Sequence, residues 1–209
     1  MSAVPAVLFD LGNVLFCDPW ETLLLTEGLG LADRLGLDRG EVREAGRELW
    51  HRFSLSEAEE ADYWAGLERR LGRPVPRDLV AETERRLLVA NPHAEALLTA
   101  AAQGQRRVGI ASNNTSFWYE KQRVRLGLDR YVDPELVFLS HRLGVSKGAE
   151  GQGLLEIAAR HADPPRSLLV EDRPANLRRA ERIGFRVLAY SFTGAGGVPP
   201  TDLLEKMSA

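Results

Sequence analysis

The sequence contains a single cysteine, Cys17, so no intrachain disulfide can form and no metal site can be built from cysteines alone. A lone thiol is most simply a partly buried free cysteine in a reducing compartment. Basic residues show no excess either, because 27 lysines and arginines face 30 aspartates and glutamates, for a net charge of -3. Without a basic field, nucleic acid is not indicated as a partner.

Long apolar runs and a leader pattern are missing as well. No stretch approaches the length of a membrane-spanning helix. The N-terminus has no basic region followed by an apolar segment of signal length. We therefore expect a soluble, cytoplasmic protein without a membrane partner. Its 209 residues, 44% of them hydrophobic, suffice for one large domain or for a core with a smaller insert.

The residues around Asp10 organise the chain. Residues 6–9 are an apolar run, partly β-branched and aromatic, which predicts a short buried strand. Asp10 follows directly, and Gly12-Asn13 is typical of a turn. A carboxylate at the C-terminal end of a buried strand in an open α/β sheet lies at the crevice where such sheets bind ligands. Asp10 is therefore the first candidate functional residue, and a plain strand end is the alternative.

Residues 19–91 contain no convincing strand and favour helices. Apolar residues recur at helical spacing in three stretches, residues 23–35, 42–53 and 64–71. Ser56 and Glu59 form the pattern of a helix start, with Ser56 as the cap. A further helix is predicted over residues 78–89. A block of helices with strands before and after it predicts a helical insert that stands over a sheet.

Three tryptophans lie in or beside this insert, at positions 20, 50 and 64. We interpret Trp20, Trp50 and Trp64 as its core. Stacking of one of them on a substrate is the alternative.

From residue 92 onward, strand-like and helix-like segments alternate. The predicted strands are residues 107–111, 136–139, 167–170 and 185–189. The predicted helices are residues 92–102, 117–126, 149–160 and 174–183, with a short helix at the end of the chain. Such alternation is typical of a parallel sheet with right-handed crossovers, and apolar strands indicate helices on both faces. We therefore predict an α/β fold with a Rossmann-like core, residues 1–18 and 92–209, and a helical domain, residues 19–91.

Polar groups follow four of the predicted strands. They are Asp10, Ser112 with Asn113, Lys147, and Glu171 with Asp172. The C-terminal ends of parallel strands share one edge, so these groups are expected to converge. Converging carboxylates can hold a hard cation such as Mg²⁺, and a lysine and a hydroxyl can bind phosphoryl oxygens. An aspartate can attack phosphorus to give an aspartyl-phosphate, while the cation and the lysine neutralise the developing charge.

In this order and placement, the motifs resemble those of the haloacid dehalogenase (HAD) superfamily over nearly the whole chain. They read Phe9-Asp10-Leu11-Gly12-Asn13-Val14, Ile110-Ala111-Ser112-Asn113, Lys147, and Val170-Glu171-Asp172 followed by Asn176. The resemblance implies a Mg²⁺-dependent hydrolase of phosphoric monoesters, with the insert as its helical cap. The first motif looks most like that of bacterial members that act on glucose 1-phosphate. This implies a small phosphorylated metabolite, such as a sugar phosphate, as the substrate.

The resemblance also implies roles for individual residues. Asp10 would be the nucleophile and Lys147 the cation that orients nucleophile and phosphate. Ser112, with Asn113 beside it, would bind the substrate phosphate. The magnesium ligands implied are Asp10, the carbonyl of Gly12 and Asp172, with Glu171 in support.

Gly12 departs from the pattern of the superfamily. Most phosphatases of the superfamily carry at this position an aspartate that acts as general acid and base. A glycine can offer its carbonyl to the metal but cannot protonate a leaving group. From the sequence alone, we therefore expect rates that depend steeply on the pKa of the leaving group. A smaller departure is Gly148, which follows Lys147 where proline is usual.

Two other functions share these motifs. A 2-haloacid dehalogenase uses the same aspartate on carbon and needs no metal, so the pair Glu171-Asp172 argues against it. A degenerate member that binds a phosphorylated ligand without turnover is the third reading, and Gly12 is the feature that favours it. Hydrolysis of p-nitrophenyl phosphate with and without Mg²⁺, followed by a test of chloroacetate, separates the three.

Overall fold

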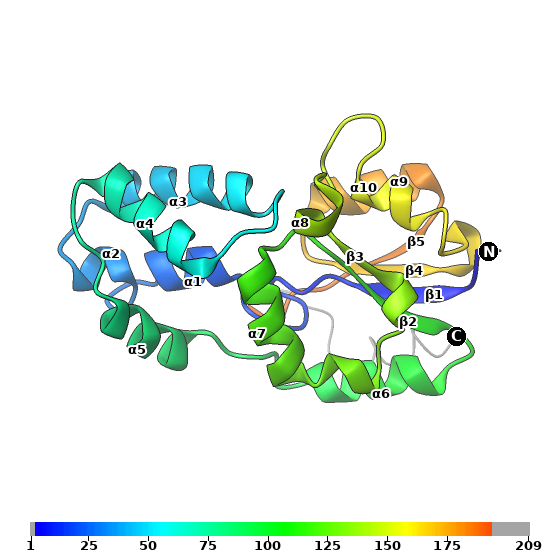
Figure 1. The fold of residues 1–209 in the computed structure, drawn as a ribbon. Coiled ribbons are helices and arrows are strands. Elements are labelled where there is room, and N and C mark those ends of the chain that lie inside the picture. Colours follow the sequence, from blue (N-terminus) through cyan, green and yellow to red (C-terminus); the bar gives the residue numbers. More distant parts are fainter. Residues whose placement is uncertain (1–2, 194–209) are drawn as a thin grey trace.

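A parallel five-stranded sheet in the order β3-β2-β1-β4-β5 forms the centre of the computed structural model, which describes residues 3–193 (Figure 1). The strands are β1 (Ala6–Phe9), β2 (Arg107–Ser112), β3 (Val137–Leu139), β4 (Leu168–Glu171) and β5 (Arg186–Ala189). Each predicted strand is confirmed to within a residue at either end. β1 lies in the middle of the sheet, where Val7 is in register with Val108 on β2 and Leu168 on β4.

Helices cover both faces of this sheet, and the side chains of β1 alternate between them. Val7 and Phe9 pack with apolar residues of α6 (Ala94–Gln103) and α7 (Ser116–Leu126). Ala6 and Leu8 point to the opposite face and pack with α9 (Leu154–Ala158) and α10 (Pro174–Ile183). Figure 1 shows α9 and α10 above the sheet and α6 and α7 below it. The strands are apolar on both faces because neither face meets water. The α/β fold class is confirmed.

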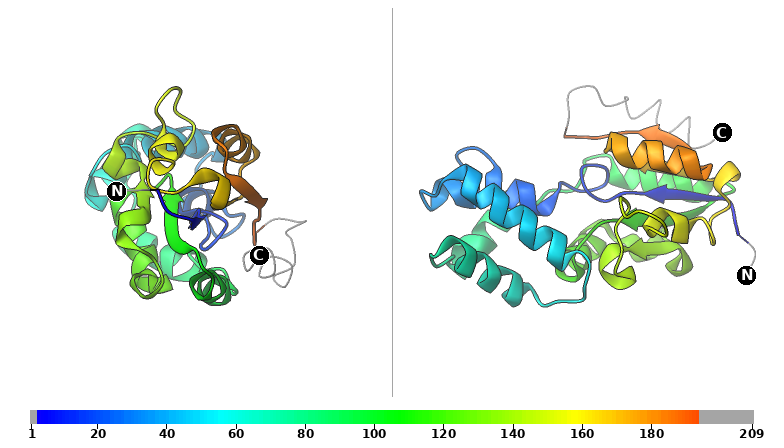
Figure 2. Two further views of the ribbon diagram at one scale, coloured as in Figure 1. Left: turned by 90° about the vertical axis from the view of Figure 1, so that its right-hand side faces the viewer. Right: turned by 90° about the horizontal axis from the view of Figure 1, so that it is seen from above.

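The chain between β1 and α6 folds into helices alone. They are α1 (Pro19–Leu25), α2 (Leu31–Arg34), α3 (Arg39–Phe53), α4 (Glu60–Leu71) and α5 (Arg77–Leu87). These helices lie beyond the end of the sheet (Figures 1 and 2). They surround their own apolar cluster, which includes Trp20 and Trp64 and extends to Trp118 of α7. We call residues 19–91 the helical insert.

Short elements complete the described part of the chain. They are the helix α8 (Ser140–Leu143) and the 3-10 helices η1 (Leu128–Arg130), η2 (Pro134–Leu136) and η3 (Pro164–Arg166). Within residues 3–193, no helix is both long enough and apolar enough to span a membrane.

The predicted helix start at Ser56 is wrong. The helix α4 begins at Glu60, and the hydroxyl of Ser56 donates to the carbonyl of Arg52 in the preceding helix. The cause is a tertiary contact, because Ser116 of α7 hydrogen-bonds both backbone groups of Ala58. These bonds hold the link between α3 and α4 out of the helical conformation.

The helix predicted over residues 149–160 is shorter than expected. Only Leu154–Ala158 is α-helical, because Gly151 adopts a left-handed φ of 72° ahead of it. The amide of Leu154 donates to the carbonyl of Ser146 at 3.1 Å, which closes the loop that carries Lys147. The short helix predicted at the end of the chain lies outside the described residues.

Candidate active site

The carboxyl edge of the sheet gathers the predicted site residues. Asp10 follows β1, Ser112 is the last residue of β2, and Glu171 is the last residue of β4. β1 lies between β2 and β4, so their ends are neighbours at one edge. From β1 the sheet extends in one direction to β2 and β3 and in the other to β4 and β5. Ligands of open α/β sheets bind at such a change of direction.

Lys147 is buried at this edge and bridges two carboxylates. Its Nζ lies 2.9 Å from Oδ2 of Asp10 and 2.5 Å from Oε2 of Glu171. The other oxygen of Glu171 accepts the amide of Arg173 at 3.0 Å. Oδ1 of Asp10 accepts the amide of Leu11 at 2.7 Å. The charges are thus paired, which a buried ammonium and two buried carboxylates require.

Burial and the ion pair between Asp10 and Lys147 shift the pKa values of these two groups in opposite directions. Burial raises the pKa of Asp10 to about 6, the charge of Glu171 adds to this rise, and Lys147 opposes it. Burial lowers the pKa of Lys147, but Asp10 and Glu171 outweigh it, so the net direction is upward. Lys147 is therefore an ammonium at neutral pH.

Three carboxylates at this edge fit a divalent cation. Asp10, Glu171 and Asp172 each have an oxygen that lies within 4.8 Å of the others. Oδ1 of Asp172 is buried and has no hydrogen-bond partner in the described structure. A buried carboxylate oxygen without a donor is costly unless a cation or water satisfies it. The set of oxygen ligands suits a hard ion such as Mg²⁺.

Ser112 and Asn113 lie beside these charges at the end of β2. The hydroxyl of Ser112 is close enough to Asp10 to lower the pKa of its carboxyl group. Oδ1 of Asn113 accepts the backbone amide of Lys147 at 2.8 Å and so fixes the loop that delivers the lysine. Asn113 also lines the cavity in front of Asp10, together with Gly12. All seven residues that the sequence singles out thus lie at this edge.

Solved structures with the same architecture are described as a HAD family enzyme, a HAD-like hydrolase and a dehalogenase. A HAD family enzyme from Bacteroides thetaiotaomicron superposes with a TM-score of 0.71 at 14% identity, over 93% of this chain and 97% of that one. A predicted HAD-like hydrolase from Porphyromonas gingivalis gives 0.69 at 20% identity, over 98% and 99%. The chain has the HAD fold. A structure described as a dehalogenase shares this fold with a TM-score of 0.65 at 16% identity, over 100% and 99%.

The same Bacteroides enzyme is described in complex with magnesium and inorganic phosphate. No protein-family model and no curated protein sequence matches this chain. None of the three proteins is described as a sugar phosphatase, so the resemblance to glucose-1-phosphate phosphatases stays a prediction.

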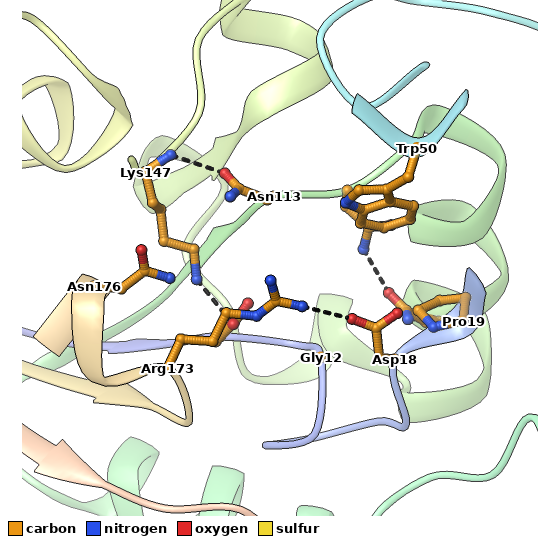
Figure 3. Close-up of a pocket in the computed structure, with 11 residues that line it drawn as sticks. Gly12, Asp18, Pro19, Trp50, Asn113, Lys147, Arg173 and Asn176 are labelled. Atoms are coloured by element: carbon orange, nitrogen blue, oxygen red, sulfur yellow. Dashed lines mark hydrogen bonds and ion pairs between the residues drawn. The ribbon is translucent and has the colours of Figure 1, made fainter. Parts of the chain in front are cut away.

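A small cavity lies between the helical insert and the edge of the HAD core. Its free volume is about 30 Å³, and Asp10 and Lys147 line it from the core. Pro19 and Trp50 line it from the insert. Figure 3 shows Trp50 across the cavity from Lys147. Trp50 is thus unlike Trp20 and Trp64, which are buried in the apolar cluster of the insert.

Asp18 and Arg173 are cavity residues that the sequence analysis missed. Nη2 of Arg173 donates to Oδ2 of Asp18 at 3.0 Å, beside the start of the helical insert (Figure 3). Asp18 is the N-cap residue of α1, but its side chain makes no capping hydrogen bond. In the sequence Asp18 has the signature of a helix cap and Arg173 that of a surface residue. No local sequence pattern predicts that these two residues contact each other.

Proposed function

We propose that this protein is a HAD-superfamily phosphatase that uses Mg²⁺ to hydrolyse a small phosphorylated metabolite through an aspartyl-phosphate on Asp10. The observation that carries the proposal is the bridge of Lys147 between Asp10 and Glu171, beside an acidic cluster with an orphaned oxygen on Asp172. A paired ammonium and a cation site at one nucleophilic carboxylate suit a substrate that carries several negative oxygens.

Each residue of the site has its own role in the proposed reaction. Asp10 attacks phosphorus, the bond to the leaving oxygen breaks, and the phosphoryl group is then bound to the aspartate. Lys147 holds the Asp10 carboxylate in place and attracts the phosphoryl oxygens. Ser112 and Asn113 would hold the remaining oxygens. Water then attacks the aspartyl-phosphate, which releases phosphate and restores Asp10.

Magnesium would be held by Asp10, Asp172 and the carbonyl of Gly12, with Glu171 in support. When bound, it supplies positive charge that stabilises the transferring phosphoryl group. Both oxygens of Glu171 already accept hydrogen bonds, from Lys147 and from Arg173. Glu171 therefore supports the site chiefly by fixing Lys147 and the turn after β4.

We also propose that residues 19–91 form a mobile cap domain over a core made of residues 1–18 and 92–209. Trp50 and Pro19 of the insert close the cavity over Asp10. Small-molecule sites generally have volumes of about 300–1,000 Å³, far above the 30 Å³ found here. This small volume supports entry of the substrate while the insert is displaced. Its return excludes water and brings selecting side chains to the substrate.

The test is hydrolysis of p-nitrophenyl phosphate with Mg²⁺ and after chelation, followed by a panel of phosphorylated metabolites. Radiolabelled substrate and an acid quench should reveal phosphorylated protein. Asp10→Asn should form no phosphorylated protein. Its turnover should fall by about 10³-fold or more, as is usual for a missing nucleophile. Asp78→Asn, at an exposed position in the insert, is the matched control and should keep both.

Other outcomes would favour the other two functions. Release of chloride from chloroacetate without phosphatase activity would identify a dehalogenase. Phosphate binding without turnover of any ester would identify a degenerate binding protein. Unchanged turnover in Asp10→Asn would overturn the proposal outright.

A further inference from the structure

The proposed reaction needs a proton donor that Gly12 cannot supply. An alkoxide that leaves phosphorus is a strong base, and protonating it in the transition state typically contributes about 10²- to 10⁴-fold to the rate. The same group must then take a proton from the attacking water. A donor has to lie in the cavity that holds Asp10, so the described residues that line this cavity are the candidates.

Most of these candidates fail on chemistry. Asp10 is the nucleophile, and Lys147 is locked between two carboxylates that raise its pKa. The guanidinium of Arg173 does not release its proton in proteins. The other polar side chains of the lining are amides and an indole, which do not act as acids in this range. Asp18 is the one remaining titratable group among the described residues of the lining.

We infer that Asp18 is the general acid and base of this site. Its side chain is 7% exposed and lines the cavity with Asp10 and Lys147. Oδ2 is held by Arg173, whereas Oδ1 is buried and has no partner in the described structure. Oδ2 thus anchors the carboxyl group, and Oδ1 has no donor in the described structure, which favours a proton on it.

The carboxyl group of Asp18 lies beside position 12, where a Cβ would make only an ordinary van der Waals contact with it. A Cβ at position 12 would lie 3.7 Å from Oδ2 of Asp18 and would have no other heavy atom within 4 Å. Asp18 therefore reaches the space beside position 12 with Oδ2, the oxygen that Arg173 holds. Its backbone is fixed there by Asn13, whose Oδ1 accepts the Asp18 amide at 3.2 Å.

The electrostatic surroundings suit a proton carrier near neutral pH. Burial raises the pKa of Asp18 to about 7, Arg173 opposes this rise, and the negative charges of Glu21 and Asp10 add to it. A group with a pKa near the working pH can both give and take a proton.

Asp18 would act in both steps of the proposed phosphatase reaction, on which this inference rests. As Asp10 attacks phosphorus, the bond from phosphorus to the leaving oxygen breaks and that oxygen takes the proton of the Asp18 carboxyl group. The Asp18 carboxylate then takes a proton from the water that attacks the aspartyl-phosphate. The bond between phosphorus and Asp10 breaks, and Asp18 is protonated again. The sum is one ester and one water converted into an alcohol and phosphate.

The experiment measures kcat/KM, which reports the first phosphoryl transfer, for aryl and alkyl phosphates of rising leaving-group pKa. Wild-type protein should show a shallow dependence on leaving-group pKa, because Asp18 protonates the poor leaving groups. This replaces the steep dependence expected from the sequence alone. In Asp18→Asn, kcat/KM for alkyl phosphates should fall by about 10²- to 10⁴-fold. In the same variant, kcat/KM for p-nitrophenyl phosphate should change less than about fivefold, because its leaving group needs no proton.

Two further variants separate proton transfer from structure. Arg173→Gln removes the anchor but keeps the acid, so it should not reproduce the selective loss for alkyl phosphates. Gly12→Asp/Asp18→Asn places a carboxyl group in the same space and should restore alkyl turnover in part. With p-nitrophenyl phosphate, Asp18→Asn should also accumulate phosphorylated protein, because the attacking water lacks its base.

The outcomes distinguish this inference from the proposed function. A steep dependence in the wild type, or an equal loss for both ester classes in a folded Asp18→Asn, overturns the role of Asp18 and leaves Asp10 untouched. Failure of the wild type to hydrolyse any phosphate ester, or full activity in Asp10→Asn, overturns the phosphatase and the role of Asp18 together. The wild-type series needs no variant to fold.

Discussion

Asn13 and Asp172 join the loops that follow β1 and β4, because Nδ2 of Asn13 donates to Oδ2 of Asp172 at 3.1 Å. Asn13 holds a left-handed φ of 56°, which asparagine tolerates better than most residues. Its Oδ1 accepts the amide of Asp18. The side chain of Asn13 therefore orients the carboxylate of Asp172 and also the residue before the helical insert, Asp18.

We predict that Asn13→Gly weakens Mg²⁺ binding by about 10- to 100-fold, the usual effect of losing a group that orients a metal ligand. Glycine keeps the left-handed backbone accessible, so the change isolates the loss of the two side-chain hydrogen bonds. The measurement is the rise in melting temperature with Mg²⁺ concentration, which requires no substrate. Asp172→Ala is the reference and should abolish this rise, whereas Asp78→Asn should keep it. A wild-type Mg²⁺ response in Asn13→Gly would show that the bond to Asp172 is dispensable.

Lys147→Met should strongly destabilise the protein as well as inactivate it. The substitution leaves Asp10 and Glu171 buried side by side without their shared cation. Breaking such a buried pair typically costs about 3–5 kcal/mol. The deficit should shrink as the pH falls below about 6, where Asp10 takes up a proton, and Mg²⁺ should also reduce it. Denaturant unfolding at several pH values measures this.

Lys121 offers a matched control for that variant. It also bridges two carboxylates, those of Glu60 and Glu84, but its side chain is 35% exposed. Water screens such a pair, so Lys121→Met should cost about 1 kcal/mol or less. Equal destabilisation by the two variants would contradict the assigned burial of the Lys147 pair.

The sheet and the polar residues at its carboxyl edge could be predicted because their signals are local. Each strand is a short apolar run that ends in a polar residue, and parallel order brings those ends together. The sequence therefore predicts that Asp10, Lys147 and Asp172 lie together, and the structure brings them to one edge. The same logic failed at Ser56, where a local capping pattern lost to the contact between Ala58 and Ser116.

The pair of Asp18 and Arg173 could not be predicted for a different reason. The two residues are 155 positions apart and meet only when the loops that follow β1 and β4 come together in the folded chain. Asp18 precedes a helix and Arg173 follows a strand, so each has a complete local explanation. The two buried oxygens without partners, on Asp18 and Asp172, emerge only from packing.

Substitutions at Trp50 and Trp64 should have different effects, the first on substrate selectivity and the second on the stability of the helical insert. Trp50 lines the cavity, whereas Trp64 is 2% exposed in the apolar cluster. Trp50→Ala should change the ratio of kcat/KM between phosphorylated metabolites by about tenfold or more, since roughly 1–3 kcal/mol of discrimination comes from a single pocket contact. Trp64→Phe should lower the melting temperature and leave that ratio as it is. A wild-type ratio in a folded Trp50→Ala would mean that this part of the insert does not select the substrate.

Asp18 should also make stability depend on pH in a direction that an exposed aspartate would not. Its pKa rises from 3.8 to about 7 on folding. Between these values the folded chain holds a proton that the unfolded chain has lost, so the contribution of Asp18 to stability falls as pH rises and levels off above about pH 7. An asparagine side chain cannot ionise, so Asp18→Asn should melt about 5–10 °C above wild type at pH 8, and the gap should close below pH 4. Asp78→Asn should show no such trend. Melting curves of the three proteins from pH 3.5 to 8.5, without metal or substrate, test this. A gap that stays constant with pH would mean that Asp18 is ionised throughout and could not deliver the proton.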